Sequence, residues 1–309
     1  MKQFDYKIED NTYICEINEQ IGGIEILAFR GTKARLELPE KILYEGREWE
    51  LCAIGKKAFL GCRGLRSVVL PASVKEIRDW AFSQCGQLEG VQILEKGSVK
   101  ESNPHICFGN GVFADCPNIR YIAVGVEKTD DVAVLLAATV NQVPAEDLLR
   151  DAESGSEHWF GKWDQRLFSF INEDDAEGYT NMVLCGEEDI VRNVPEFMED
   201  KRRRKAGLCM LRLMHDRLLP QNMRQFFTEY LLTHTKGCES EEAWEVIVLE
   251  HGEDLSYYQL LAELGGVTAD NIDAMVQDLD TSHAEAKAFL IRYKQEHFAV
   301  ADVFDLFTL

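Results

Sequence analysis

The sequence AIGKKAFLGCRGLRSVVLPASV at residues 53–74 is followed at residues 76–94 by EIRDWAFSQCGQLEGVQIL, and the two stretches are copies of one pattern. The second copy lies 23 residues after the first, and an equivalent apolar residue returns at each matched position. The matched pairs are Ile54 and Ile77, Ala58 and Ala81, Phe59 and Phe82, Cys62 and Cys85, Leu65 and Leu88, and Val68 and Val91. A period in the twenties is the signature of a leucine-rich solenoid.

Two further stretches extend the pattern. GNGVFADCPNIRYIAV at 109–124 is a third copy, 31 residues after the second, and its eight extra residues predict an insertion around 95–104. Its Phe, Cys, Leu and Val places are taken by Phe113, Cys116, Ile119 and Ile122. A partial earlier copy is LELP at 36–39, and the extra residues after it predict a hairpin that turns at Glu45-Gly46.

The spacing within a copy predicts how each coil is built. Leu65, Val68 and Leu70 alternate in a short strand, so their side chains face inward. Ala58, Phe59 and Cys62 are spaced as on a short helical or 3₁₀ segment that closes the other side of the coil. Such a coil cannot bury both apolar edges alone, so the coils must stack. Stacking places Cys62, Cys85 and Cys116 in a column about 5 Å apart, and plain packing of small apolar thiols is the favoured interpretation over metal or redox chemistry.

The repeated pattern I-G-x-x-A-F-x-x-C-x-x-L-x-x-V-x-L-P-x-S-V-x-x-I resembles the BspA-type leucine-rich repeat. The resemblance is specific over residues 53–94 and weaker at 36–39 and 106–124. It implies a bacterial, non-catalytic repeat that binds partners, and many members of this family are surface proteins. The family has no binding residue at a fixed motif position, so the resemblance assigns none here. Residues 1–35 are interpreted as a β-rich cap, with strands at 13–17 and 24–29 and a turn at Gly22-Gly23.

Charge divides the 309-residue chain. It carries 54 Asp+Glu and 33 Lys+Arg, a net charge of -21. Residues 1–125 hold 17 acidic and 16 basic residues, net -1, which leaves net -20 for residues 126–309. We therefore expect two domains, 1–125 and 126–309. The acidic balance argues against nucleic acid and anionic lipid as partners.

The second part has helical periodicity. Helices are expected at 131–140, from Pro144, and at 156–171, 173–185, 187–192, 195–219, 220–234, 240–251 and 255–264, then from Thr268 and from Ser282, where Ser282 and Glu285 form a capping box. Residues 252–297 weakly resemble ankyrin-type helix pairs, a class of interaction module. The predicted fold class is therefore α+β: a short leucine-rich-repeat β-solenoid followed by an all-α helical-hairpin domain, ankyrin-like or α-solenoid.

The search for chemistry finds no catalytic, cofactor-binding or metal-binding motif. The seven histidines have no H-x₃-H or HExxH spacing, and the pair His105 and Cys107 alone is not a metal site. The acidic clusters at 173–177 and 187–189 lack EF-hand spacing. The run KRRRK at 201–205 is either an anion-binding patch or, as we favour, a solvated helix face paired with Glu196, Glu199 and Asp200. The apolar tail 298–309 is expected to pack rather than serve as a docking peptide.

The sequence predicts a non-enzymatic protein–protein interaction scaffold. The alternatives are a surface-associated or secreted adhesion protein of BspA type, or an enzyme with a spatially assembled site. No export signal, no transmembrane segment and nine scattered cysteines favour the cytoplasm and argue against membrane insertion, with a surface or secreted location if the start was trimmed. A glycan partner stays open without support from any motif.

Overall fold

The computed structural model describes residues 3–95, 106–143, 145–179 and 193–298. The chain divides into two compact units, Met1–Arg166 and Leu167–Leu309, and each is described by itself. The last repeat strand ends at Val124 and the first helix begins at Asp131. The change from strand to helix thus falls near residue 125, while the first compact unit also takes in the helices that follow. The domain boundary between 125 and 126 stays a prediction.

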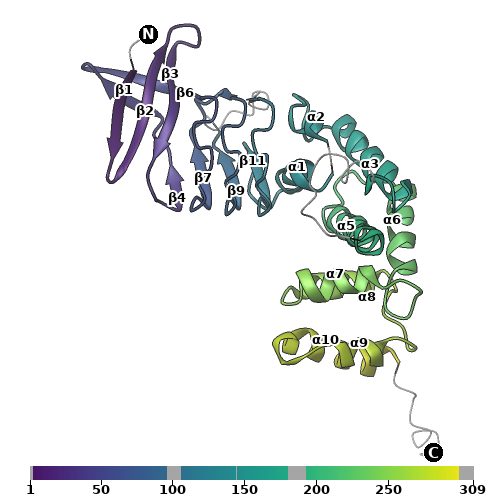
Figure 1. Cartoon of the computed structure of the whole chain (residues 1–309). Helices are drawn as coiled ribbons and strands as arrows, with labels where there is room; N and C mark the ends of the chain where they lie inside the picture. Colours follow the sequence, from purple (N-terminus) through teal and green to yellow (C-terminus); the bar gives the residue numbers. More distant parts are fainter. Residues whose placement is uncertain (1–2, 96–105, 144, 180–192, 299–309) are drawn as a thin grey trace, which may run out of the picture. The chain divides into compact units, whose positions relative to one another are not determined.

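The repeats of the first unit form a parallel sheet of four strands in the order β11-β9-β7-β4 (Figure 1). These strands are β4 (Arg35–Glu37), β7 (Ser67–Leu70), β9 (Gly90–Ile93) and β11 (Tyr121–Val124). The register pairs Leu36 with Val68, Val68 with Val91, and Val91 with Ile122. All four of these side chains are buried, because alternate residues of each strand face the interior of the coil.

A second, seven-stranded sheet combines the cap with the other edge of the coils. Its strands are β1 (Gln3–Ile8), β2 (Asn11–Asn18), β3 (Gly23–Arg30), β5 (Lys41–Tyr44), β6 (Arg47–Ile54), β8 (Glu76–Ile77) and β10 (Cys107–Phe108). The predicted cap strands are β2 and β3, an antiparallel pair. The predicted hairpin is β5–β6, and its turn residues Glu45 (φ 49°) and Gly46 (φ 76°) are both left-handed, as a two-residue hairpin turn requires.

The segments that close each coil are turns, so the prediction of helical segments there is wrong. Residues 56–61, 79–84 and 110–115 are all turns. Each turn has two residues in the left-handed region, which interrupt a right-handed helix. These residues are Lys57 and Gly61, Trp80 and Gln84, and Gly111 and Asp115.

Stacked aromatic rings and backbone hydrogen bonds join neighbouring turns. The rings of Phe29, Phe59, Phe82 and Phe113 follow one another at centroid distances of 5.1, 4.9 and 5.8 Å. The Phe59 amide donates to the Ala81 carbonyl at 2.8 Å, and the Phe82 amide donates to the Val112 carbonyl at 2.9 Å. The turn side of the solenoid is thus held by a ladder of hydrogen bonds and stacked rings in addition to the two sheets.

Helices cover the last coil. These are α1 (Asp131–Asn141), α2 (Glu146–Leu149) and α3 (Glu157–Asn172). Helix α1 packs against β11, and the Asn141 side chain donates to the Cys116 carbonyl at 2.5 Å. The buried indole N–H groups of Trp159 and Trp163 donate to the carbonyls of Leu148 and Leu135. The open end of the solenoid is therefore closed by helices, as an array with an apolar core requires. Pro144, where a helix was expected to open, lies outside the described residues.

The second unit is helical. Its helices are α5 (Val194–Met214), α6 (Gln221–Thr233), α7 (Glu242–Glu250), α8 (Leu255–Glu263), α9 (Ile272–Asp278), the 3₁₀ helix η1 (Thr281–His283) and α10 (Ala284–His297). Short connections join α5 to α6, α7 to α8 and α9 to α10, which makes helical hairpins (Figure 1). The fold class predicted from the sequence is thus confirmed. Among the described helices, none combines the length and apolar character needed to cross a bilayer.

Two local predictions in this unit are wrong. The helix expected at 173–185 does not include residues 173–178: most of them are turn, and their carbonyls bind lysine side chains instead. Tyr179 is helical, and residues 180–185 lie outside the described residues. The expected cap at Ser282 is also wrong, because Asp280 takes the capping position at the start of η1. Its carboxylate accepts a hydrogen bond from the Ser282 amide at 2.8 Å. The helix expected at 187–192 and the tail 299–309 lie outside the described residues.

Candidate binding surface

The repeat residues predicted from the sequence lie in the interior of the first unit. All of them except Cys62 are buried, and Cys62 is half-buried. They are Ile54, Ala58, Phe59, Cys62, Leu65, Val68, Leu70, Ile77, Ala81, Phe82, Cys85, Leu88, Val91, Phe113, Cys116, Ile119 and Ile122. A partner can therefore contact only what these coils display outward.

The cysteine column consists of packed thiols. The Cys85 Sγ donates to the Phe59 carbonyl at 3.2 Å, and the Cys116 Sγ donates to the Phe82 carbonyl at 3.1 Å. The pKa of Cys85 is raised, first by contact with the Cys116 thiol, then by contact with the Cys62 thiol and by burial. The protonated, hydrogen-bonded Cys85 thiol is therefore a poor nucleophile, whereas contact with the Cys85 thiol lowers the pKa of Cys62 and of Cys116. Within the described part of the chain no group of three or more His, Cys, Asp or Glu could hold a metal ion.

The outward side of the four-stranded sheet, which we call the strand face, displays two rows of side chains. One row is Arg35, Ser67, Gly90 and Tyr121, and the other is Glu37, Val69, Gln92 and Ala123; Gly90 and Ala123 are buried, and the other six are at least partly exposed. Ser67, Val69 and Gln92 at its centre are half-exposed and uncharged. The Tyr121 ring lies over Gly90, and the Lys128 ammonium lies 5.3 Å from its centroid. A mixed aromatic and small polar surface of this kind suits contact with a protein.

At the ends of these strands the chain forms a cavity of about 520 Å³, which we call the strand-end hollow. Residues from three successive coils and from the end of β1 line it. The lining residues are Ile8, Glu37, Leu38, Pro39, Glu40, Pro71, Ala72, Leu94 and Glu95. Its volume falls in the range of small-ligand sites. Sequence reasoning missed the hollow, although the alignment of Pro39 with Pro71 was a signal for it.

The hollow has an apolar floor and an acidic rim. Glu37, Glu40 and Glu95 are exposed, and no described residue forms an ion pair or a side-chain hydrogen bond with them. Pro71 is buried beneath them, and the Leu94 side chain is 41% exposed. Three carboxylates that have no cationic partner among the described residues lie beside apolar surface, and they make a negative potential at one place in a nearly neutral repeat block.

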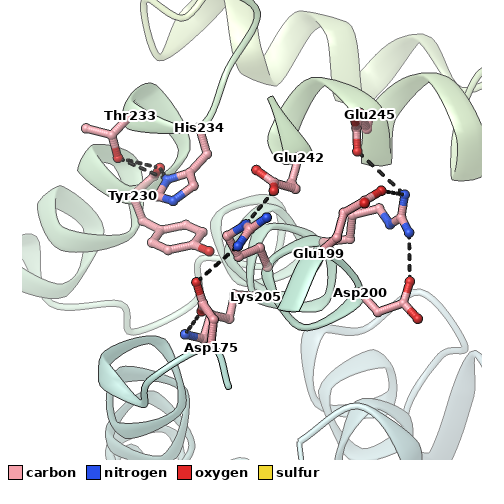
Figure 2. A network of polar contacts seen from close by, with 11 residues as sticks. Asp175, Glu199, Asp200, Lys205, Tyr230, Thr233, His234, Glu242 and Glu245 are labelled. Carbon is pink, nitrogen blue, oxygen red and sulfur yellow. Dashed lines mark hydrogen bonds and ion pairs between the residues drawn. The ribbon is translucent and has the colours of Figure 1, made fainter. Parts of the chain in front are cut away.

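In the second unit, the basic run at 201–205 belongs to an internal network of ion pairs, shown in Figure 2. Lys205 is 2% exposed, and its Nζ lies 2.7 Å from Asp175 and 2.6 Å from the Glu173 carbonyl oxygen. Lys201 is also buried and donates to the carbonyls of Asp174 and Glu177. The prediction of a solvated face is therefore wrong for both lysines.

The three arginines of this run are also engaged. Arg202 pairs with Glu242 and with Asp175, which joins α5 to α7 and to the turn before α5. Arg203 pairs with Glu199, Asp200 and Glu245, so the expected pairing with Glu199 and Asp200 is present (Figure 2). The Arg204 guanidinium lies 4.7 Å from the centroid of Phe170. These contacts occupy the charges within the unit, and we assign the run to packing rather than to an anion site.

Three of the described histidines are also held by local contacts. His234 stacks on Tyr230 at a centroid distance of 4.1 Å, and His251 stacks on Tyr257 at 3.7 Å. His283 contacts Asp280 through Nδ1 at 2.8 Å. His105 and the acidic cluster 187–189 lie outside the described residues. Cys107, the second member of the His105 pair, is exposed.

The repeat region matches a known family. Residues 47–130 match the model described as "BspA type Leucine rich repeat region (6 copies)". The match begins with β6 and ends at Asp130, whose side chain caps α1. The resemblance seen in the sequence is confirmed over this range. The family match does not reach the helical second unit, so the ankyrin-like resemblance stays a prediction. Comparison with curated proteins gives no match.

Solved structures of bacterial leucine-rich repeat proteins are similar to parts of the chain. A leucine-rich cell surface protein from Faecalibacterium prausnitzii is 20% identical over 41% of this chain and 32% of that chain, with a TM-score of 0.33. A leucine-rich repeat protein from Bacteroides capillosus is 25% identical over 40% of this chain and 86% of that chain, with a TM-score of 0.32. A Treponema pallidum leucine-rich repeat protein is 24% identical over 38% and 49% of the two chains, with a TM-score of 0.30. The chain thus spans 32% of the length of the first of these proteins.

Proposed function

We propose that the repeat block of this chain is a non-enzymatic protein-binding module and that the strand face is its contact surface. The observation that carries the proposal is the composition of this face. Its centre is uncharged and half-exposed at Ser67, Val69 and Gln92, and Tyr121 provides an aromatic side chain beside them. The repeat family that residues 47–130 match is typically non-catalytic, and leucine-rich repeats generally mediate protein binding.

Site-specific photo-crosslinking tests this proposal. Ser67 is replaced by p-benzoylphenylalanine in the full chain, the protein is irradiated in lysate of its source cells, and adducts are identified by mass spectrometry. Gln20, an exposed residue in the turn after β2, carries the same photo-reactive group in the control. We expect one dominant adduct at position 67 that is missing at position 20. Equal adduct patterns at both positions would overturn the assignment of this face.

The adhesion alternative makes the same face the contact surface and differs in location and partner. Fractionation of the source cells separates the two proposals, because a scaffold of internal proteins remains with the cytosolic fraction. Recovery of the chain on the cell surface, with an adduct to an external protein, would favour adhesion.

A further inference from the structure

We propose that the strand-end hollow binds a cationic side chain, arginine or lysine, of an extended peptide segment in the partner. This inference rests on the proposed function and adds the chemistry of the partner to it. Three features of the hollow carry it: a column of apolar residues, a gap in a row of glutamates, and the absence of a cation paired with those glutamates among the described residues.

The apolar column follows from the register of the strands. Glu37 pairs with Val69, and Leu70 pairs with Ile93. Beyond the strand ends the ladder continues, since the Leu94 amide donates to the Leu70 carbonyl at 3.0 Å. The same register aligns Pro39, Pro71 and Leu94 in successive coils. This column gives the methylene groups of a long cationic side chain an apolar surface to pack on.

The gap lies in the next row of aligned residues, one position after the apolar column. The register aligns Glu40, Ala72 and Glu95, so a small residue lies between two carboxylates. Because neighbouring coils are about 4.8 Å apart, the backbones of Glu40 and Glu95 are about 10 Å apart. Alanine fills less space than glutamate, so the glutamate row is open at Ala72, which lines the hollow. A side chain from a partner that enters over Ala72 has Glu40 on one side and the stem of Glu95 on the other, and the Glu95 carboxylate lies against Gly125 of the next coil.

Charge selects the occupant. Glu37 adds a third carboxylate from the strand itself, and these three side chains have no cation among their described contacts. An anionic group would be repelled, and a neutral apolar group would leave the rim carboxylates without a new partner. An arginine satisfies both parts of the site, because its stem is apolar and its planar guanidinium donates to carboxylates in pairs. A lysine ammonium would also neutralise the rim carboxylates, but as a compact charge without paired donors.

Fluorescence polarisation with labelled heptapeptides tests the proposal on the full chain. The first probe is Gly-Ala-Leu-Arg-Leu-Ala-Gly, and the others replace its arginine with lysine, with neutral citrulline or with glutamate. Citrulline keeps the shape of arginine and removes its charge. We expect the arginine probe to bind, and the citrulline probe to bind about tenfold more weakly. Affinity should fall as salt rises. No binding of either cationic probe at about 1 mM, or equal binding of the citrulline probe, would overturn the proposal.

Two sets of variants locate the binding. The triple variant Glu37→Gln, Glu40→Gln, Glu95→Gln should weaken binding of the arginine probe by about tenfold or more. A matched triple variant, Glu16→Gln, Glu19→Gln, Glu153→Gln, removes the same charge elsewhere in the first unit and should leave affinity unchanged. Equal loss in both triple variants would assign the effect to net charge and overturn the site.

A substitution in the gap provides an independent check. Ala72→Arg places a cation of the chain's own between Glu40 and Glu95, so it should abolish peptide binding while the protein stays folded by circular dichroism. Ala72→Ser keeps the gap open and should bind normally. The crosslinking at Ser67 reports on the proposed function separately. If the adduct at Ser67 forms while the cationic probes fail to bind, the inference about the hollow is wrong and the proposed function stands.

Discussion

The ring of Tyr121 lies so close to the backbone of Gly90 that a Cβ atom at Gly90 would be 2.5–2.6 Å from three of its ring carbons. The two residues are partners in the parallel register of β9 and β11. The aromatic side chain therefore rests on the neighbouring strand, and the absence of a side chain at Gly90 is what makes room for it. This contact shapes the strand face without involving the strand-end hollow.

Gly90→Ala should destabilise the protein by about 1–2 kcal/mol, because the new methyl group forces the Tyr121 ring away from the sheet. Urea unfolding followed by circular dichroism measures the loss. In a Tyr121→Ala background the same substitution should cost much less, since the atoms it collides with are gone. An equal cost in both backgrounds would show that the contact does not determine the effect.

Gly61→Ala isolates the conformational cost of a left-handed residue. Gly61 has φ 69°, and a Cβ atom there would have no neighbour within 4 Å, so no clash contributes. We expect a loss of about 1 kcal/mol in the free energy of unfolding. Gly64 also has open space for a Cβ atom and no left-handed φ. Gly64→Ala is therefore the control and should be neutral or slightly stabilising.

At the equivalent position in the next coil we expect the opposite effect, which is a gain in the free energy of unfolding. Gln84 has φ 60° and follows Gly61 by one repeat. Gln84→Gly should relieve the strain and stabilise the protein by up to about 1 kcal/mol, reduced by the greater freedom of glycine in the unfolded chain. The same urea titration measures it, and a destabilised variant would contradict the assignment of strain at this position.

The strand rows could be predicted from the sequence because they depend on a regular offset between copies. Val68 and Val91 are 23 residues apart and are partners in adjacent strands. The turns were harder to predict, because the left-handed positions hold glycine in one coil and another residue in the next. Gly61 and Gln84 occupy the same place, so no single residue type marks it.

The basic run and the hollow depend on distant parts of the chain. Arg202 meets Glu242, which is 40 residues away, and Lys205 meets Asp175, which is 30 residues away. Local spacing on a helix shows neither partner, since tertiary packing brings them together. The hollow depends on Ala72 lying between two glutamates from other coils, which is visible only after the coils are placed in register.

The ion pair between Arg202 and Glu242 should behave as a partly buried pair. The Glu242 side chain is 5% exposed and that of Arg202 is 23% exposed. Glu242→Met alone should cost about 3 kcal/mol, because it leaves the Arg202 charge with fewer partners in a poorly hydrated place. The double variant with Arg202→Met should cost less than this single variant. Chemical denaturation measures the losses of the two single variants, Glu242→Met and Arg202→Met, and of the double variant. A loss in the double variant equal to the sum of the two single losses would contradict the coupling.

An exposed pair in the same unit serves as the comparison. Lys294 and Asp273 lie 2.5 Å apart with side chains 44% and 64% exposed. Lys294→Met should cost less than about 1 kcal/mol, because water screens the pair and hydrates the carboxylate that remains.

Alkylation should follow the exposure and the acidity of the thiols. Cys107 is exposed and should react first with iodoacetamide, with half-buried Cys62 after it. Burial raises the pKa of Cys15 to about 12, and burial also raises the pKa of Cys209. These two thiols should react only when the protein unfolds. Timed labelling with peptide mass spectrometry measures the order, and modification of Cys209 before Cys62 under native conditions would contradict it.

The Asp280 carboxylate should show the clearest pH effect. Hydrogen bonds from the Ser282 hydroxyl, and then from the Ser282 amide and His283, lower its pKa from 3.8 to about 2. Because the pKa is lower in the folded state, Asp280 contributes stability above about pH 4, and that contribution is lost as the pH falls toward 2. Carbon-13 NMR titration of the carboxyl group measures the pKa directly. Ser282→Ala should raise it toward 3.8, whereas Ser256→Ala, which removes a serine hydroxyl from the start of α8, should leave the Asp280 pKa unchanged. A titration of Asp280 near 3.8 in the unaltered protein would show that these hydrogen bonds do not hold its charged form.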